Sequence, residues 1–144
     1  MLKNLSPLLG PELLSTLRAM GHGDEIAIVD ANFPAEFLGP LVIRLDGISA
    51  TDVLDAILAV LPLDDFVDEA AIGMAVVGDP DARPPIFDEF ETIIRRYEPK
   101  MSYSTIERFA FYERSRQAAA VVQTGEARLY GNIILKKGVI RPAS

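Results

Sequence analysis

Cysteine is absent from the sequence, and histidine occurs only once, as His22. Without cysteine the chain can form no disulfide framework and no thiolate metal site, and it has no cysteine nucleophile. It also lacks an uninterrupted apolar run of about 18 residues, which a membrane-spanning helix requires. Residues 1–14 contain one lysine and a broken apolar run, unlike a secretory signal. These absences predict a soluble, cytoplasmic protein that does not act at a membrane.

Positive charge is also scarce. The chain has 14 lysine and arginine residues against 21 aspartate and glutamate residues, which gives a net charge of −7. The phosphates of a nucleic acid demand a basic protein face. Lys136 and Lys137 are the only adjacent lysines, and two charges do not form a basic patch. The sequence therefore argues against nucleic acid as a partner.

Apolar residues, by contrast, are abundant. They make up 49% of the 144 residues, and the mean hydropathy is +0.21. A chain of this length fits a single domain, residues 1–144, and can bury a core without disulfides or metal. The apolar content is high for a small soluble monomer, and exposed apolar patches usually mark interfaces. We therefore expect contacts between the subunits of a homo-oligomer.

Hydrophobic periodicity predicts alternating helices and strands. Helices are expected over residues 11–20, 49–62, 86–98 and 108–118, and strands over residues 25–29, 41–45, 71–77, 119–124 and 132–137. Ser49 is expected to cap the second helix, with Asp52 in the position of a capping box. Residues 30–37 are expected to form a loop, because Asn-Phe-Pro disfavours regular structure. The alternation predicts an α/β fold in which helices pack on a sheet.

Two residues that flank the strand at 25–29 are candidates for chemistry. Asp30 follows the strand directly, and ligands in open α/β sheets gather outside the carboxyl ends of strands. The same aspartate could instead only cap the following turn. His22 stands between Gly21 and Gly23, and histidine side chains suit proton transfer near neutral pH. The two glycines would let a ligand approach closely, although a lone histidine in a loop can also be incidental.

Other kinds of site find less support in the sequence. A metal site made of His22, Asp24, Glu25 and Asp30 would lack the paired histidines or cysteines of zinc sites. The chain has no G-x-S-x-G motif, no G-x-G-x-x-G motif after a strand and no phosphate-binding loop. We therefore expect no metal site and no nucleotide cofactor.

Further candidates lie in the C-terminal part of the chain. Arg108 stands near the start of a helix, where the helix dipole disfavours a cation, so a contact with a ligand would explain its position. Tyr130 and Asn132 precede the last strand, and Gly131 lets the backbone turn between them. Asparagine offers hydrogen-bond donors and acceptors to a hydroxyl-rich ligand, and tyrosine offers an apolar face to a sugar ring. A hairpin turn without a ligand explains these residues equally well.

Three segments together resemble one protein family. MGHGDEIAIVDANFP (20–34), RFAFYER (108–114) and TGEARLYGNIILKKGV (124–139) are similar to the D-ribose pyranase/L-fucose mutarotase (RbsD/FucU) family. The likeness extends from about Leu2 to Val139. It implies an α/β domain with a largely parallel sheet flanked by helices, assembled into a ring-shaped oligomer, commonly a decamer. It also implies active sites between neighbouring subunits, which interconvert the anomers or ring forms of a free monosaccharide without a cofactor.

The resemblance assigns roles to individual residues. The catalytic histidine of the family falls on His22, and its sugar-binding aspartate falls on Asp30. In the mutarotase branch a sugar-contacting arginine matches Arg108, and the substrate-binding Tyr-Gly-Asn matches Tyr130, Gly131 and Asn132. The pyranase branch usually has a histidine at the position of Arg108. The resemblance therefore favours the L-fucose branch over D-ribose.

The expected reaction is mutarotation of L-fucose by acid–base catalysis. We expect His22, beside Asp30, to move the proton at the anomeric centre. Asp30, Arg108 and Asn132 would hold hydroxyl groups, and Tyr130 would place the sugar ring. Mutarotation already proceeds unaided in water, so one positioned acid–base group that supplies about 10²–10⁴-fold is sufficient. No metal, nucleotide or covalent nucleophile is required.

Alternative functions stay open at this point. The chain could be a D-ribose pyranase or a broad aldose mutarotase, a non-catalytic monosaccharide-binding protein of transport or regulation, or a purely structural ring-forming protein. Phe33 and Tyr112 are additional candidates for the lining of the pocket, on the basis of their motif positions alone.

Overall fold

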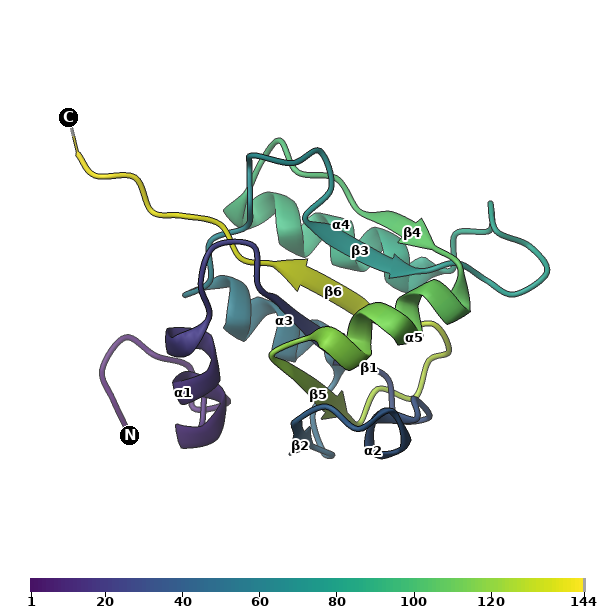
Figure 1. Ribbon diagram of the computed structural model, residues 1–144, viewed down its shortest axis with the longest axis horizontal. Helices are drawn as coiled ribbons and strands as arrows, with labels where there is room; N and C mark the ends of the chain where they lie inside the picture. Colours follow the sequence, from purple (N-terminus) through teal and green to yellow (C-terminus); the bar gives the residue numbers. More distant parts are fainter. Residues whose placement is uncertain (144) are drawn as a thin grey trace.

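The computed structural model describes residues 1–143, and within this range the chain forms five α-helices and six β-strands (Figure 1). In chain order the elements are α1 (Pro11–Ala19), β1 (Glu25–Val29), α2 (Ala35–Leu38), β2 (Val42–Leu45), α3 (Ala50–Leu58), β3 (Ala71–Met74), α4 (Pro85–Tyr97), β4 (Ser104–Ile106), α5 (Arg108–Gln117), β5 (Ala120–Thr124) and β6 (Ile133–Lys136). Every helix and strand predicted from periodicity is present, with ends that shift by up to four residues. Across the described residues, no helix has both the length and the apolar character that crossing a membrane requires.

The six strands form one sheet in the order β2-β5-β1-β6-β3-β4. β6 runs antiparallel to its neighbours β1 and β3, and the other three pairs of strands are parallel. The expected largely parallel sheet is therefore confirmed, with one reversed strand. Because β6 is reversed, the residues that precede it lie beside the carboxyl ends of β1 and β3.

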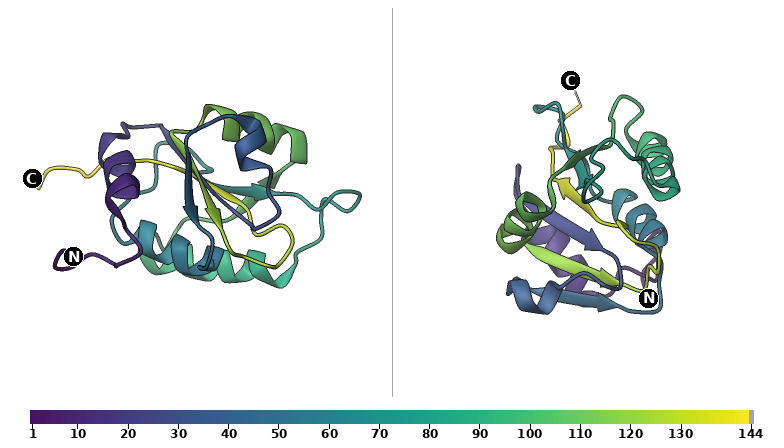
Figure 2. Two further views of the ribbon diagram at one scale, coloured as in Figure 1. Left: turned by 90° about the horizontal axis from the view of Figure 1, so that it is seen from below. Right: turned by 90° about the vertical axis from the view of Figure 1, so that its right-hand side faces the viewer.

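Helices cover both faces of the sheet, so the protein has three layers (Figures 1 and 2). α1, α3 and α4 pack on one face, and α2 and α5 pack on the other. The side chains of β1 alternate between the two layers: Ile26 and Ile28 join the first core, whereas Ala27 and Val29 pack with Phe111 of α5. Burial on both faces explains why β1 is a continuous apolar run in the sequence.

The α3 helix illustrates how local sequence sets the ends of an element. The Ser49 hydroxyl accepts a hydrogen bond from the Asp52 N–H at 3.2 Å, as predicted for an N-cap. The helix ends at Leu58, earlier than the predicted end at Pro62. A proline disfavours the helical conformation of the residue before it, and the chain closes instead in a tight turn on the Ile57 carbonyl.

The sequence pattern fails at short elements and loop boundaries. α2 overlaps the end of residues 30–37, which were expected to form a loop, and it is capped by Gly39, whose φ of +85° lies in the left-handed region. β4 is a three-residue strand at the edge of the sheet. Such short segments contain too few residues to establish a period. The strand expected over residues 71–77 ends at Met74, and the chain then leaves the sheet in a projecting loop before α4 (Figure 1).

Candidate active site

Six of the residues singled out in the sequence, Phe33 and Tyr112 among them, line one small cavity, which we call the edge cavity because it lies beyond the ends of β1 and β3. Its volume is about 200 Å³. It is lined by Asp30, Asn32, Phe33, Met74, Val77, Arg108, Tyr112, Leu129, Tyr130 and Asn132. The reversed direction of β6 brings the turn before β6 against the loop after β1, while the start of α5 closes a further side. The structure therefore gathers residues that are up to about a hundred positions apart in the chain.

Asp30 is the buried acid of the edge cavity, with only 5% of its surface exposed. Its N–H donates to Asn132 Oδ1 at 2.9 Å, and its Oδ1 accepts the Asn32 N–H at 2.9 Å. Burial raises the pKa of the Asp30 carboxyl, and hydrogen bonds from Asn32, Asn132 and Gly131 offset part of this rise. Asp30 thus caps the turn and also lines the cavity, so its role in the turn does not exclude a role in ligand binding. A hydroxyl group that donates to this poorly hydrated carboxylate would form a strong hydrogen bond.

Arg108 is the first residue of α5, as the sequence predicts. Glu107 stabilises this helix start, because its carboxylate accepts the Ala110 N–H at 3.0 Å. The guanidinium carbon of Arg108 lies 4.5 Å from the centre of the Phe109 ring, and its buried Nε has no hydrogen-bond partner within residues 1–143. A buried donor without a partner costs about 1–3 kcal/mol, and a ligand oxygen in the edge cavity would remove this cost.

The turn from Tyr130 to Asn132 is held from two sides. Tyr130 has a φ of +63°, in the left-handed region that bulky residues rarely adopt. Its hydroxyl accepts the Val77 N–H at 3.1 Å. A Cβ on Gly131 would lie 2.8 Å from Cγ of the buried Glu126, which itself accepts hydrogen bonds from Arg128. Only glycine therefore fits at position 131. A strained φ such as that of Tyr130 is common at ligand-binding sites.

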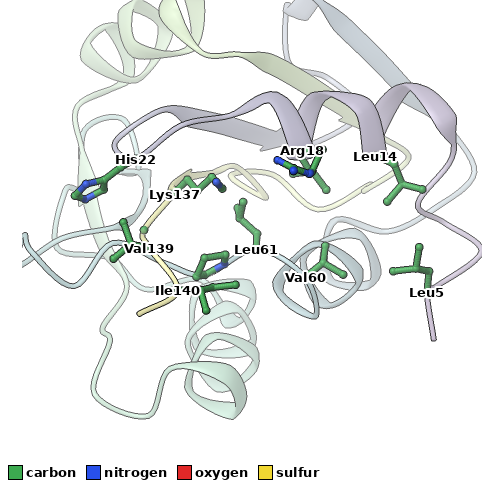
Figure 3. A pocket seen from close by; sticks show the side chains of 12 residues that line it. Leu5, Leu14, Arg18, His22, Val60, Leu61, Lys137, Val139 and Ile140 are labelled. Carbon is green, nitrogen blue, oxygen red and sulfur yellow. The ribbon is translucent and has the colours of Figure 1, made fainter. Parts of the chain in front are cut away.

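His22 is not part of the edge cavity. It precedes β1, whereas Asp30 follows it, and the strand alone spans about 13 Å at about 3.3 Å per residue. His22 instead lines an apolar groove of about 550 Å³, where it stands beside Lys137 and Val139 (Figure 3). The lining of this His22 groove is Leu5, Leu14, Leu17, Arg18, His22, Val60, Leu61, Pro62, Lys137, Gly138, Val139 and Ile140. The expectation that Asp30 lies beside His22 is therefore wrong within one chain, because an extended strand separates the residues at its two ends.

Asp64 is the partner of His22, and the sequence analysis missed it. His22 Nε2 lies 3.0 Å from Asp64 Oδ1, and the Asp64 side chain is 4% exposed. The same oxygen accepts the Phe66 N–H at 3.0 Å, and the Asp64 N–H donates to the Lys136 carbonyl at 3.0 Å. The hydrogen bond with His22 lowers the pKa of the Asp64 carboxyl, so this group stays ionised.

The pairing with Asp64 orients the imidazole of His22. When the carboxylate accepts the Nε2–H, the neutral ring presents the lone pair of Nδ1. Within the described part of the chain His22 Nδ1 has no hydrogen-bond partner, and the side chain is 43% exposed. This nitrogen is free to take a proton from a ligand, and the carboxylate of Asp64 would stabilise the imidazolium that forms.

The two glycines beside His22 have different causes. Gly23 has a φ of +87° and its N–H donates to the Lys137 carbonyl at 2.9 Å, so the backbone requires glycine there. A Cβ on Gly21 would lie 3.6 Å from Asp24 Oδ2, which is an ordinary contact distance. Gly23 thus has a reason in the turn itself, whereas the space around Gly21 does not demand glycine.

The four residues weighed as metal ligands do not come together. Asp24 accepts the Gly21 N–H at 2.8 Å, Glu25 forms an ion pair with Arg114, and Asp30 lies at the other end of β1 from His22. Residues 1–143 contain no cluster of three or more side chains suited to hold a metal ion.

Nearly the whole chain matches one protein family. The model of the RbsD / FucU transport protein family matches residues 3–140, and the chain belongs to this family. The human fucose mutarotase is 48% identical over 145 residues, which cover 96% of this chain and 94% of the human protein. The resemblance inferred from the sequence motifs is thereby confirmed.

Solved structures of relatives share the fold. The fucose mutarotase from Streptococcus pneumoniae, solved in complex with L-fucose, has a TM-score of 0.87 at 43% identity and covers 97% of this chain and 100% of that chain. RbsD from Bacillus subtilis, solved in complex with D-ribose, has a TM-score of 0.76 at 25% identity and covers 98% of this chain and 100% of that chain. Both relatives were solved with a monosaccharide bound.

Proposed function

We propose that the protein is an L-fucose mutarotase, an isomerase that interconverts the α and β anomers of the free sugar without a cofactor. The observation that carries this proposal is the edge cavity, where a buried carboxylate, a guanidinium and a carboxamide converge. The human and pneumococcal relatives that bear the name fucose mutarotase match the chain over nearly its full length, which supports the same activity.

The edge cavity suits a monosaccharide in size and in polarity. Its volume of about 200 Å³ is below the roughly 300–1,000 Å³ of pockets for larger ligands. Asp30 accepts hydrogen bonds, Arg108 donates them and Asn132 can do both, so hydroxyl groups find partners on one side. Met74 and Leu129 add apolar surface to the lining. A 6-deoxy sugar such as L-fucose carries both hydroxyl groups and a methyl group, and it can use both kinds of surface.

In this proposal His22 moves the proton. Mutarotation removes a proton from the anomeric hydroxyl, places a proton on the ring oxygen and breaks the bond between this oxygen and C1, which leaves an open-chain aldehyde. Rotation about the C1–C2 bond and reclosure on the other carbonyl face give the other anomer. His22 Nδ1 would take the proton from the hydroxyl and return it to the ring oxygen, while Asp64 stabilises the imidazolium. Such acid–base catalysis contributes about 10²–10⁴-fold.

The sugar must then be held between two copies of the chain. The edge cavity and His22 lie at opposite ends of β1. The proton carrier of one copy would therefore serve the cavity of its neighbour. A head-to-tail contact of this kind, repeated from copy to copy, closes into a ring if the rotation between copies permits. We propose such a ring, and we expect a decamer.

One activity in the same enzyme class has support of its own. The fold similarity to RbsD, which was solved with D-ribose, makes D-ribose pyranase activity or broad aldose mutarotation the second candidate. Arg108 argues for L-fucose as the better substrate, because a pocket that hydrogen-bonds particular hydroxyl groups discriminates strongly between sugars.

The test is magnetisation transfer between the α and β anomers of L-fucose, measured by NMR with purified protein. We expect exchange far above the buffer rate with the wild type and the buffer rate with His22→Ala. Parallel experiments with D-galactose and D-ribose define the specificity. An unchanged exchange rate in His22→Ala would remove this mechanism, and sugar binding without faster exchange would identify a binding protein instead.

A further inference from the structure

The imidazole of His22 contacts two side chains of one short segment, Asp64 and Phe66. Asp64 binds Nε2, and the ring of Phe66 lies 5.0 Å from the imidazole centre. Phe66 is itself 64% exposed, so packing from the core does not fix its ring. A neighbour that limits the movement of Phe66 would also limit the positions open to His22.

The main chain fixes only the first part of this segment. The Gly138 N–H donates to the Pro62 carbonyl at 2.8 Å, and the Asp64 N–H donates to the Lys136 carbonyl at 3.0 Å. These two hydrogen bonds tie residues 62–64 to the chain that leaves β6. Beyond Asp64 the connection between the two segments is made by side chains.

Arg141 makes that second connection. Its Nη1 and Nη2 donate to the two carboxylate oxygens of Asp65 at 2.7 and 3.1 Å, which is the two-pronged geometry that fixes an arginine side chain most firmly. Its guanidinium carbon also lies 5.0 Å from the centre of the Phe66 ring. The Phe66 ring therefore has the guanidinium of Arg141 and the imidazole of His22 as neighbours. Arg141 lies one residue beyond the segment 3–140 that the family model matches.

We infer that Arg141 is a positioning residue, which holds Phe66 against His22 and thereby keeps the imidazole on Asp64; the consequence for catalysis rests on the proposed function. Arg141 does not line the edge cavity, so it acts on the proton carrier and leaves the sugar contacts alone. The electrostatic surroundings of His22 include Asp64, Asp65 and Lys137 as well, and the test must separate position from charge.

The first readout is kinetic. Arg141→Ala is expected to lower kcat about two- to fivefold with little change in KM, because an exposed ion pair biases a conformational equilibrium by a factor of this size. Asp65→Asn breaks the two-pronged ion pair and leaves the positive charge, so it should act in the same direction, and the double variant should be no worse than Arg141→Ala alone. Arg83→Ala is the matched control, since it breaks an exposed ion pair with Asp88 far from His22.

The second readout does not depend on activity. Because His22 is the only histidine, protein labelled with ¹³C-histidine gives the signals of one imidazole. In the wild type we expect a nuclear Overhauser contact between this imidazole and the Phe66 ring, and in Arg141→Ala and Asp65→Asn its loss together with a changed ring-current shift. Arg83→Ala should match the wild type.

An imidazole signal that is unchanged in Arg141→Ala would overturn the inference, whatever happens to kcat. A changed signal with unchanged kcat in an active wild type would overturn the link to catalysis. If the wild type itself does not accelerate mutarotation, the proposed function fails, and the imidazole signals alone then decide whether Arg141 positions His22.

Discussion

Two inactive variants should restore each other's activity when they assemble together. His22→Ala removes the proton carrier but leaves the edge cavity intact, and Asp30→Asn damages the cavity but leaves His22 intact. If each active site combines His22 of one copy with the edge cavity of the next, a mixed ring contains some junctions at which both parts are wild type. Such junctions cannot arise if one chain supplies the whole site.

The expected magnitude follows from counting junctions. In a ring mixed at random from equal amounts of the two variants, about half of the copies offer an intact His22, and about half of their neighbours offer an intact cavity. About a quarter of the junctions are then complete, so the mixed protein should show about a quarter of the wild-type rate per chain.

The assay is exchange between L-fucose anomers, measured on rings purified after co-expression with two different affinity tags. The matched control mixes Asp30→Asn with Asn132→Ala, which damage the same cavity, and this mixture should stay inactive. Activity at the level of the separate variants in the first mixture, with mixed rings shown by both tags, would refute the division of the site between copies.

Three other substitutions test individual contacts. Asp64→Asn should lower kcat about ten- to a thousandfold with a small effect on KM, because the amide cannot stabilise an imidazolium; anomer exchange over a range of L-fucose concentrations measures this. Gly131→Ala should lower the free energy of unfolding by about 1–3 kcal/mol in chemical denaturation, because the new Cβ would stand 2.8 Å from Glu126 Cγ. Asp30→Asn should raise Tm at neutral pH while it weakens sugar binding. Burial raises the pKa of Asp30, so ionisation opposes folding, and the wild type should gain stability relative to this variant as the pH falls through the raised value. A melting temperature difference that does not change with pH would contradict this reading of Asp30.

Three residues in or beside the edge cavity could be singled out from the sequence because each one shows a local anomaly. Asp30 places a carboxylate directly after an apolar strand, Arg108 places a cation at a helix start, and Gly131 permits a turn immediately before a strand. These are relations between neighbours in the sequence, and physical rules for strands, helix dipoles and turns expose them without a structure. The pattern also established the order of helices and strands, apart from the short α2 and β4.

Asp64 shows where such reasoning ends. The sequence has two adjacent acids at this point, and nothing distinguishes them locally. In the fold the Asp64 side chain is 4% exposed and binds His22, whereas Asp65 is 52% exposed and pairs with Arg141. The contact between His22 and Asp64 joins residues 42 positions apart, so it exists only after the 62–64 segment has paired with the chain leaving β6.

The proposed head-to-tail contact would also account for the high apolar content of the chain. Ile140 in the His22 groove is 83% exposed, and Leu129 in the edge cavity is 64% exposed. Exposed apolar surface costs about 25 cal/mol per Å² relative to burial. A head-to-tail contact that brings His22 to the next copy's cavity would cover the rims of both sites. The contact that completes the chemistry would then also bury the apolar side chains, and an isolated chain would have a sugar pocket without its proton carrier.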